Sequence, residues 1–283
     1  MQACCDFRSR CGISVDYPPD IAAEYRRLLH WLSSLLRPVL DRVYTCSPEL
    51  VEAELEQLAS QIRSGSLARQ HERVLRVHLL SIEMQARMDV SGLPPTPWQL
   101  RMLLDLLEQR SPDLVCDLLL TRELLLWRLI ADNSGLRPLD RGELELLLGR
   151  LEGLMEDRQL WHVLAMWAFR HGERELLARA YGIFLVNPGS SLNQALWQRV
   201  NLMYLLLDGR AGPRDVLESM RALSVHPQVV EFRRHILPRC IEAGIADESL
   251  QHALDERMES LRRRGYEWRG SEARTKSLRT RTI

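Results

Sequence analysis

Apolar residues recur along most of the chain at steps of three and four positions, the period of one face of an α-helix. The first clear stripe runs from Tyr25 to Leu36, behind a Pro-Pro-Asp start that can cap a helix at Asp20. Pro38 is expected to kink or end that helix. No segment keeps the two-residue alternation typical of a strand, so the pattern predicts an all-α protein. Further helices are predicted to begin near Ser47, near Leu67, after Thr96 and after Asp113, and another is predicted from Asp140 to Asp157. Three more are predicted between Gln159 and Gly209. A last group of three is marked by Pro213, Pro227 and Gly244.

Residues 91–97 form the richest proline stretch in the chain and are the candidate domain boundary. An ordinary turn between two packed helices explains the same prolines, so both interpretations stay open. The predicted organisation is a flexible arm over residues 1–17, N-terminal helical hairpins or a small helical bundle over 18–91, a helical-repeat domain over 96–264, and a basic flexible tail over 265–283.

Glycines recur at a nearly constant interval in the second half of the chain. Gly135, Gly172, Gly209 and Gly244 are 37, 37 and 35 positions apart. Intervals of this length are typical of stacked helical hairpins, because one hairpin cannot bury both of its faces alone. The spacing therefore favours an α-solenoid, although a bundle whose hairpins have similar lengths accounts for it equally well.

The segment from residue 161 to 188 resembles a tetratricopeptide repeat. Leu177 and Phe184 depart from the motif, because the family usually has alanine there, and larger side chains hold the helices further apart. The next unit keeps part of the motif in a register that slips by one residue, so the resemblance covers about residues 161–227. The matching positions are Trp161, Leu164, Ala165, Gly172 and Tyr181, and in the next unit Trp197, Tyr204, Gly209 and Pro227.

Arrays of this kind expose an extended surface that binds a peptide or a helix of another protein. The resemblance therefore implies a non-enzymatic adaptor, chaperone-like protein or scaffold, with another protein as its partner and a homo-oligomer as a further possibility. In the resembling family the concave face is built from first-helix positions. Exposed helix surface and packing between helices are the other roles open to these positions. Carried over to this chain, they are Gln159, His162, Met166, Phe169, Arg170, Gln198 and Arg199.

The charge of the chain is balanced, with 38 basic and 38 acidic residues, so no overall attraction to nucleic acid or anionic membranes is expected. Lys276 is the only lysine, which is typical of a GC-rich genome and indicates a bacterial source. The start of the chain lacks the basic and apolar regions of a signal peptide. The longest apolar runs fall far short of the ~20 residues of a membrane span, so we expect a cytoplasmic protein.

The C-terminal tail is locally basic and interleaves arginine with aromatic residues, a combination that can neutralise phosphates and stack on bases. It supports an alternative function, a regulatory nucleic-acid-binding protein. A solvated tail, or one that docks on an acidic partner, explains the same composition. The candidate residues of the tail are Arg262, Arg263, Arg264, Tyr266, Trp268 and Arg269.

No motif in the chain indicates catalysis. His71 and His78 are seven positions apart, too far along a helix to share one metal ion. Cys4, Cys5 and Cys11 lack the paired spacing of a zinc site, and Cys116 and Cys240 fit a helical core. We therefore predict no catalytic residue, no metal and no cofactor, while a helical enzyme whose pocket joins distant residues stays a third possibility.

Overall fold

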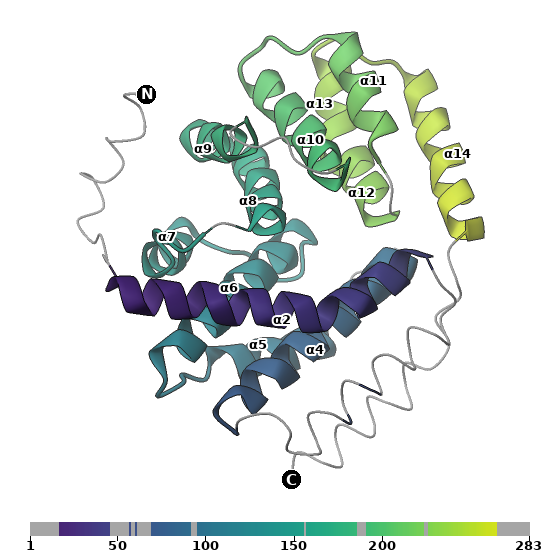
Figure 1. Cartoon of the computed structure of the whole chain (residues 1–283). Helices are drawn as coiled ribbons and strands as arrows, with labels where there is room; N and C mark the ends of the chain where they lie inside the picture. Colours follow the sequence, from purple (N-terminus) through teal and green to yellow (C-terminus); the bar gives the residue numbers. More distant parts are fainter. Residues whose placement is uncertain are drawn as a thin grey trace.

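A computed structural model of the whole chain describes residues 17–45, 57, 60, 69–91, 95–155, 157–185, 191–223 and 226–264. Helices account for nearly all of these residues, and none of them lies in a strand. The prediction of an all-α protein is confirmed (Figure 1). Residues 1–16 of the predicted arm over 1–17 and the predicted tail over 265–283 lie outside the described residues, whereas Tyr17 is described and its hydroxyl donates to the carbonyl of Arg150 at 2.8 Å.

The helices follow one another with short connections. Thr96, Asp113 and Asp140 cap three of them, as their sequences indicate: the amides of Gln99, Cys116 and Glu143 donate to the capping side chains at 3.3, 2.8 and 2.9 Å. The helices are α2 (Pro19–Thr45), α4 (Arg69–Ser91), α5 (Pro97–Glu108), α6 (Leu114–Asn133), α7 (Arg141–Arg150), α8 (Arg158–His171), α9 (Arg174–Leu185), α10 (Ser191–Leu207), α11 (Pro213–Arg221), α12 (His226–Glu231), η1 (Phe232–Ile236), α13 (Leu237–Glu242) and α14 (Glu248–Arg264).

Two predicted helix ends differ from the structure. Helix α2 continues past Pro38 to Thr45, because a proline inside a helix removes one backbone bond without necessarily stopping the helix. Helix α7 ends at Arg150 rather than at Asp157, and a turn follows in which Gly153 has a φ of 77°. That backbone conformation, natural for glycine, interrupts the helix.

The four regularly spaced glycines end the first helix of four successive hairpins. Their φ angles are 72°, 71°, 71° and 69°. In each turn the glycine amide donates to the carbonyl three residues back, and the next amide donates to the carbonyl five residues back, which is the Schellman pattern. We name the units hairpin 1 (α6 and α7), hairpin 2 (α8 and α9), hairpin 3 (α10 and α11) and hairpin 4 (residues 226–242 and α14).

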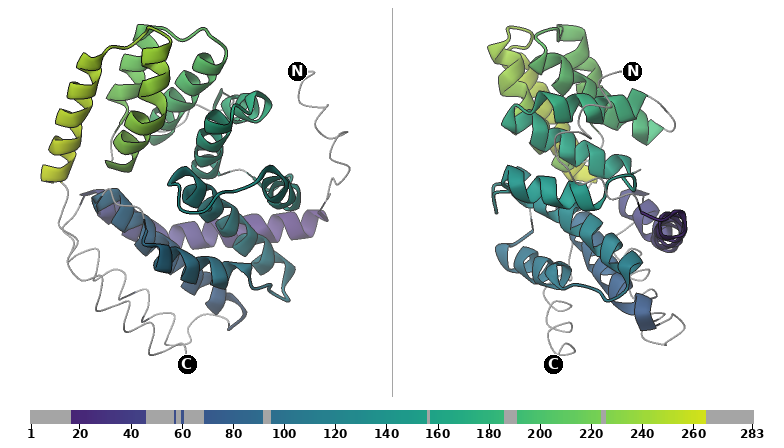
Figure 2. Two further views of the ribbon diagram at one scale, coloured as in Figure 1. Left: turned by 180° about the vertical axis from the view of Figure 1, so that it is seen from behind. Right: turned by 90° about the vertical axis from the view of Figure 1, so that its left-hand side faces the viewer.

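Hairpins 1, 2 and 3 pack in chain order through their first helices. Helix α6 packs against α8, α8 packs against α10, and α9 fills the space beside both α8 and α10. The N-terminal helices α2, α4 and α5 all lie on α6. Hairpin 4 returns to α4 through α12, so the chain curls back on itself, as the views in Figures 1 and 2 show.

This arrangement buries the first helices on several sides at once. In α8, every residue from Leu160 to Phe169 except Val163 is buried. Each fully buried Leu, Met or Phe side chain contributes roughly 1.5–3 kcal/mol, so apolar packing dominates the stability of the array. Among the described residues, no helix combines the length and the apolar character that crossing a membrane requires.

The first helix of hairpin 4 contains a π-helical turn, η1. Pro238 follows this turn and has no amide hydrogen to give to the Arg234 carbonyl four residues earlier, and its ring crowds that carbonyl. The backbone widens instead, and the amide of Leu237 donates to the carbonyl of Phe232 five residues back. Such turns are frequent at functional sites.

Candidate interaction site

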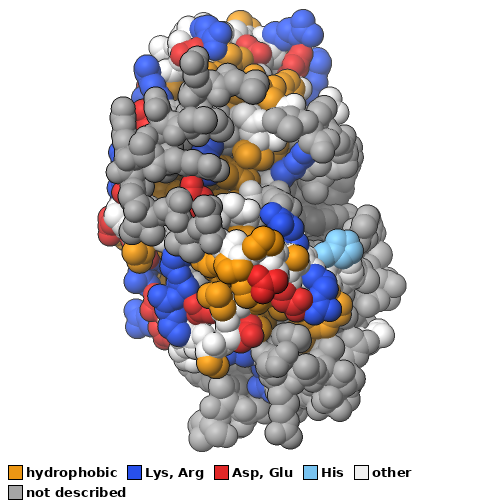
Figure 3. Space-filling view, turned by 60° about the vertical axis from the view of Figure 1, so that its left-hand side comes forward, with side chains coloured by type: hydrophobic (Ala, Val, Ile, Leu, Met, Phe, Trp, Pro, Cys, Tyr) orange, Lys and Arg blue, Asp and Glu red, His pale blue; other side chains and the backbone are white. Residues whose placement is uncertain are grey.

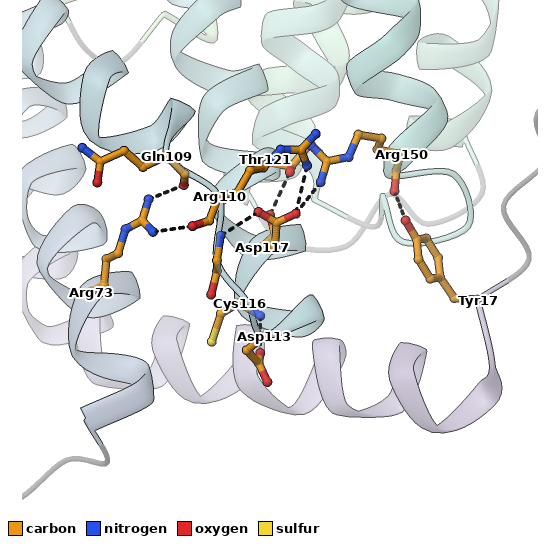
Figure 4. A network of polar contacts seen from close by, with 10 residues as sticks. Tyr17, Arg73, Gln109, Arg110, Asp113, Cys116, Asp117, Thr121 and Arg150 are labelled. Carbon is orange, nitrogen blue, oxygen red and sulfur yellow. Dashed lines mark hydrogen bonds and ion pairs between the residues drawn. The ribbon is translucent and has the colours of Figure 1, made fainter.

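A network around Asp117 joins the N-terminal helices to hairpin 1 (Figure 4). The carboxylate of Asp117 accepts hydrogen bonds from Arg110 at 3.0 Å, from Arg150 at 2.5 Å and from the amide of Ser111 at 3.1 Å. Burial alone would raise the pKa of Asp117, but these three donors hold it below its ordinary value. The network ties the start of α6 to the end of α7.

Two further side chains in the same region donate to backbone carbonyls. Arg73 of α4 donates to the carbonyl of Arg110, just after α5, at 3.0 Å (Figure 4). It also donates to the carbonyl of Leu106 in the last turn of α5 at 2.8 Å. The hydroxyl of Tyr17 donates to the carbonyl of Arg150 at 2.8 Å. Because the last carbonyls of a helix have no partner within it, these contacts are structural caps.

A buried polar network anchors α4 to α6. Ser81 donates to Glu123 at 2.8 Å, and the indole nitrogen of Trp127 donates to the Ser81 hydroxyl at 2.8 Å. The ring of His78 lies 3.4 Å from Glu123, which also pairs with Arg122. Burial alone would raise the pKa of Glu123, but His78 and Arg122 keep it below its ordinary value. The contacts of Ser81 with Glu123, of Trp127 with Ser81 and of His78 with Glu123 join α4 to hairpin 1.

A third cluster, which we call the hairpin junction, joins hairpins 1, 2 and 4; it consists of Asp132, Asn133, Arg170, His171 and His235. Arg170 donates to the carbonyl of Asp132 at 2.8 Å, to its carboxylate at 2.9 Å and to the Asn133 side chain at 3.1 Å. His235 of η1 hydrogen-bonds to the backbone of Asn133. Basic groups at the end of α6 complement the helix dipole, so the junction is a cap that also fixes the hairpins together.

The residues predicted to bind a partner lie mostly inside the protein. His162, Met166, Phe169 and Arg199 are 6%, 1%, 3% and 1% exposed, so in this conformation they pack between helices. Arg170 belongs to the hairpin junction, and Gln198 is half-buried. Their role in partner binding stays a prediction.

Other predicted residues lie beyond what the structure describes. Gln159 is part of α8, and Arg262, Arg263 and Arg264 end α14, but the side chains of these residues lie outside the described part. Tyr266, Trp268, Arg269 and the N-terminal cysteines lie outside it entirely.

Cys116 and Cys240 are buried, as their helical positions indicated. Burial raises the pKa of each thiol to about 12, which leaves both protonated and unreactive. Within the described part of the chain, no three His, Cys, Asp or Glu side chains are arranged to hold a metal ion.

Large apolar side chains are exposed on the second helices of three hairpins. Leu146 of α7, Leu185 of α9 and Leu217 of α11 are 64%, 51% and 44% exposed. Figure 3 brings forward the side of the molecule that carries α7 and α9, where apolar side chains lie among charged ones. We call Leu146, Leu185 and Leu217 the second-helix leucines.

Sequence reasoning missed the second-helix leucines, although α7 carries a usable signal. Its sequence has three consecutive leucines, and a helical face cannot bury all three. Leu144 and Leu147 face the core, which leaves Leu146 outside.

Comparison with protein-family models found no family that matches the chain. Searches of curated proteins and of solved structures likewise found no match.

Proposed function

We propose that this protein is a non-enzymatic interaction module of a bacterial cytoplasm, a tetratricopeptide-like array of helical hairpins that binds a peptide or helix of a protein partner. The observation that carries the proposal is the presence of an exposed leucine on the second helix of each of three successive hairpins. Exposed apolar side chains on a regular scaffold are what a protein partner can bury.

The four matching glycine turns support the array interpretation. Each hairpin turns through a left-handed glycine with the same two hydrogen bonds, and the first helices of hairpins 1, 2 and 3 pack in sequence. Repeated hairpins with a continuous layer of first helices are the arrangement that the tetratricopeptide resemblance implies.

The partner is proposed to contact the second helices rather than the first helices. Side chains of the first helices such as Met166 and Phe169 are almost fully buried, and exposing one of them costs roughly 1.5–3 kcal/mol. The second-helix leucines are already in contact with solvent, so covering them requires no rearrangement of the array. Covering each half-exposed leucine contributes about 1 kcal/mol.

The test is affinity capture of a partner from the source cells with the full chain and two variants. The triple variant Leu146→Ser, Leu185→Ser and Leu217→Ser removes the proposed contacts without opening the core. We expect it to weaken binding by about 3 kcal/mol, on the order of a hundredfold.

Leu114→Ser is the matched control, because Leu114 is 45% exposed but belongs to the first helix of hairpin 1. Nuclease treatment of each eluate separates protein partners from those held by nucleic acid. Capture that the triple variant retains, or that the control loses to the same extent, contradicts the proposal.

A further inference from the structure

The glycine turn that ends α6 differs from the three equivalent turns because a side chain from another hairpin lies against it. Arg234 belongs to η1 in hairpin 4, and its Nη2 lies 3.9 Å from the point where a Cβ atom of Gly135 would be. The corresponding points at Gly172, Gly209 and Gly244 have no heavy atom from elsewhere in the chain within 4 Å. The turn itself therefore does not require this contact, since three equivalent turns form without it.

Arg170 of hairpin 2 contacts the end of the same helix. Its Nη1 donates to the carboxylate of Asp132 at 2.9 Å and to the side chain of Asn133 at 3.1 Å. Its Nε and Nη2 make no hydrogen bond within the described part of the chain, and the side chain is 24% exposed. Arg234 is exposed, and none of the described carboxylates pairs with it. Two guanidinium groups from different hairpins therefore lie at the end of α6 with N–H donors that have no protein acceptor.

Asp132, the carboxylate of the hairpin junction, is already occupied. One of its oxygens accepts from Arg170, and Nε2 of His171 lies 3.3 Å from that same oxygen. The other oxygen accepts from the amide of Leu139 at 2.7 Å. Among the described residues, no other carboxylate pairs with a basic side chain of the junction or with Arg234. The donors around the end of α6 therefore outnumber the acceptors.

The positive charge of this region comes from its arginines. The hydrogen bond of His235 to the backbone of Asn133 favours a protonated ring, but burial and the charges of Arg170 and Arg234 outweigh it and lower the pKa of His235 to about 4. His235 is therefore neutral near pH 7. The charges of Arg170 and Arg234 together still exceed that of the Asp132 carboxylate, so the region attracts an anion.

We propose that the end of α6 is a binding site for a phosphate group, held by Arg170 and Arg234. Guanidinium groups donate paired N–H bonds to phosphate, and a phosphate group has enough acceptor oxygens to serve both side chains. Arg170 belongs to hairpin 2, Arg234 to hairpin 4 and the turn at Gly135 to hairpin 1. A bound phosphate therefore joins three hairpins and stabilises the closed form of the array, in which hairpin 4 returns to the N-terminal part of the chain.

Titration calorimetry of the full chain with inorganic phosphate and with O-phosphoserine, at constant ionic strength and with serine as the uncharged control, tests this proposal. We expect phosphate binding that Arg234→Gln weakens at least about tenfold, because charge-assisted hydrogen bonds are lost. Arg239→Gln is the matched control: Arg239 is an exposed arginine of the same hairpin, but it pairs with Glu242 at 3.5 Å, and its replacement should leave the affinity unchanged. Tighter binding of O-phosphoserine identifies a phosphate ester as the ligand, and tighter binding of inorganic phosphate identifies the free ion; both results support the site.

Failure of both phosphates to bind overturns the proposal, and so does binding that Arg234→Gln leaves unchanged or that Arg239→Gln weakens equally. Should Arg234→Gln fail to fold, the amide resonances of the native chain decide instead. Phosphate should shift the amide resonance of Gly135 and leave that of Gly209, in the equivalent turn of hairpin 3, in place; equal shifts at the two glycines, or none at Gly135, overturn the proposal. Because no protein partner is present, the outcome is independent of the test of the proposed function.

Discussion

Replacement of Gly172 by alanine probes the turn that joins α8 to α9. Gly172 has a φ of 71°, a conformation that costs an ordinary residue roughly 1–2 kcal/mol. A Cβ atom added there would meet no heavy atom within 4 Å, so the cost is conformational and involves no collision. We expect Gly172→Ala to lower the free energy of unfolding by about 1–2 kcal/mol.

Gly182 provides the matched control ten positions further along the chain. It lies inside α9, and a Cβ atom there would also meet nothing within 4 Å. Because alanine favours a helix over glycine by about 1 kcal/mol, Gly182→Ala should raise the free energy of unfolding by roughly that amount. The same substitution is therefore expected to destabilise the protein at Gly172 and to stabilise it at Gly182. The free energies of unfolding of the two variants should differ by about 2–3 kcal/mol.

Equilibrium unfolding in urea, followed by far-UV ellipticity and tryptophan fluorescence, measures both variants against the native chain. Gly172→Ala with unchanged or increased stability would refute the reasoning, because the left-handed glycine would then not be needed for the turn. A destabilised Gly182→Ala would show that crowding, rather than backbone conformation, governs these positions.

Two further substitutions test the contacts that hold the array together. Glu123→Gln removes the buried charge that accepts from Ser81 and pairs with Arg122, and it leaves Arg122 with Asp157 as its carboxylate partner; it should lower the free energy of unfolding in urea by about 2 kcal/mol, and a loss below about 1 kcal/mol would contradict the importance of this network. Pro238→Ala restores an amide that can donate to the carbonyl of Arg234, so a crystal structure of this variant should show the π turn relaxed to an α-helix, with persistence of the π turn as the contrary result.

Local features of the fold could be predicted because each depends on a few neighbouring residues. Thr96 and Asp113 cap helices because their side chains accept from amides three positions later. Gly172 and Gly209 end helices because only glycine adopts the required φ without strain. The residues that determine each of these caps and turns lie within about one helical turn of one another, so the local sequence is enough to predict them.

The buried state of His162 and Phe169 could not be predicted in the same way. Whether a first-helix side chain is exposed depends on what the rest of the chain places against it, and contacts such as that of α12 with α4 join segments more than a hundred positions apart. The resemblance to open repeat arrays pointed to an accessible face, whereas this chain packs helices against its own first helices. Leu146 was missed for the complementary reason: it lies on the exposed face of α7, whereas the buried apolar stripe was the pattern used to predict the helices.

Photocrosslinking in the source cells tests the proposed binding surface most directly. A benzophenone amino acid placed in turn at Leu146, Leu185 and Leu217 would react with whatever covers these positions, and the same label at Leu114 is the control of similar exposure. We expect the three second-helix positions to crosslink to one and the same protein, and position 114 to give no such product. Crosslinks to that protein from position 114 alone, or none from the three leucines, would contradict a partner site on the second helices.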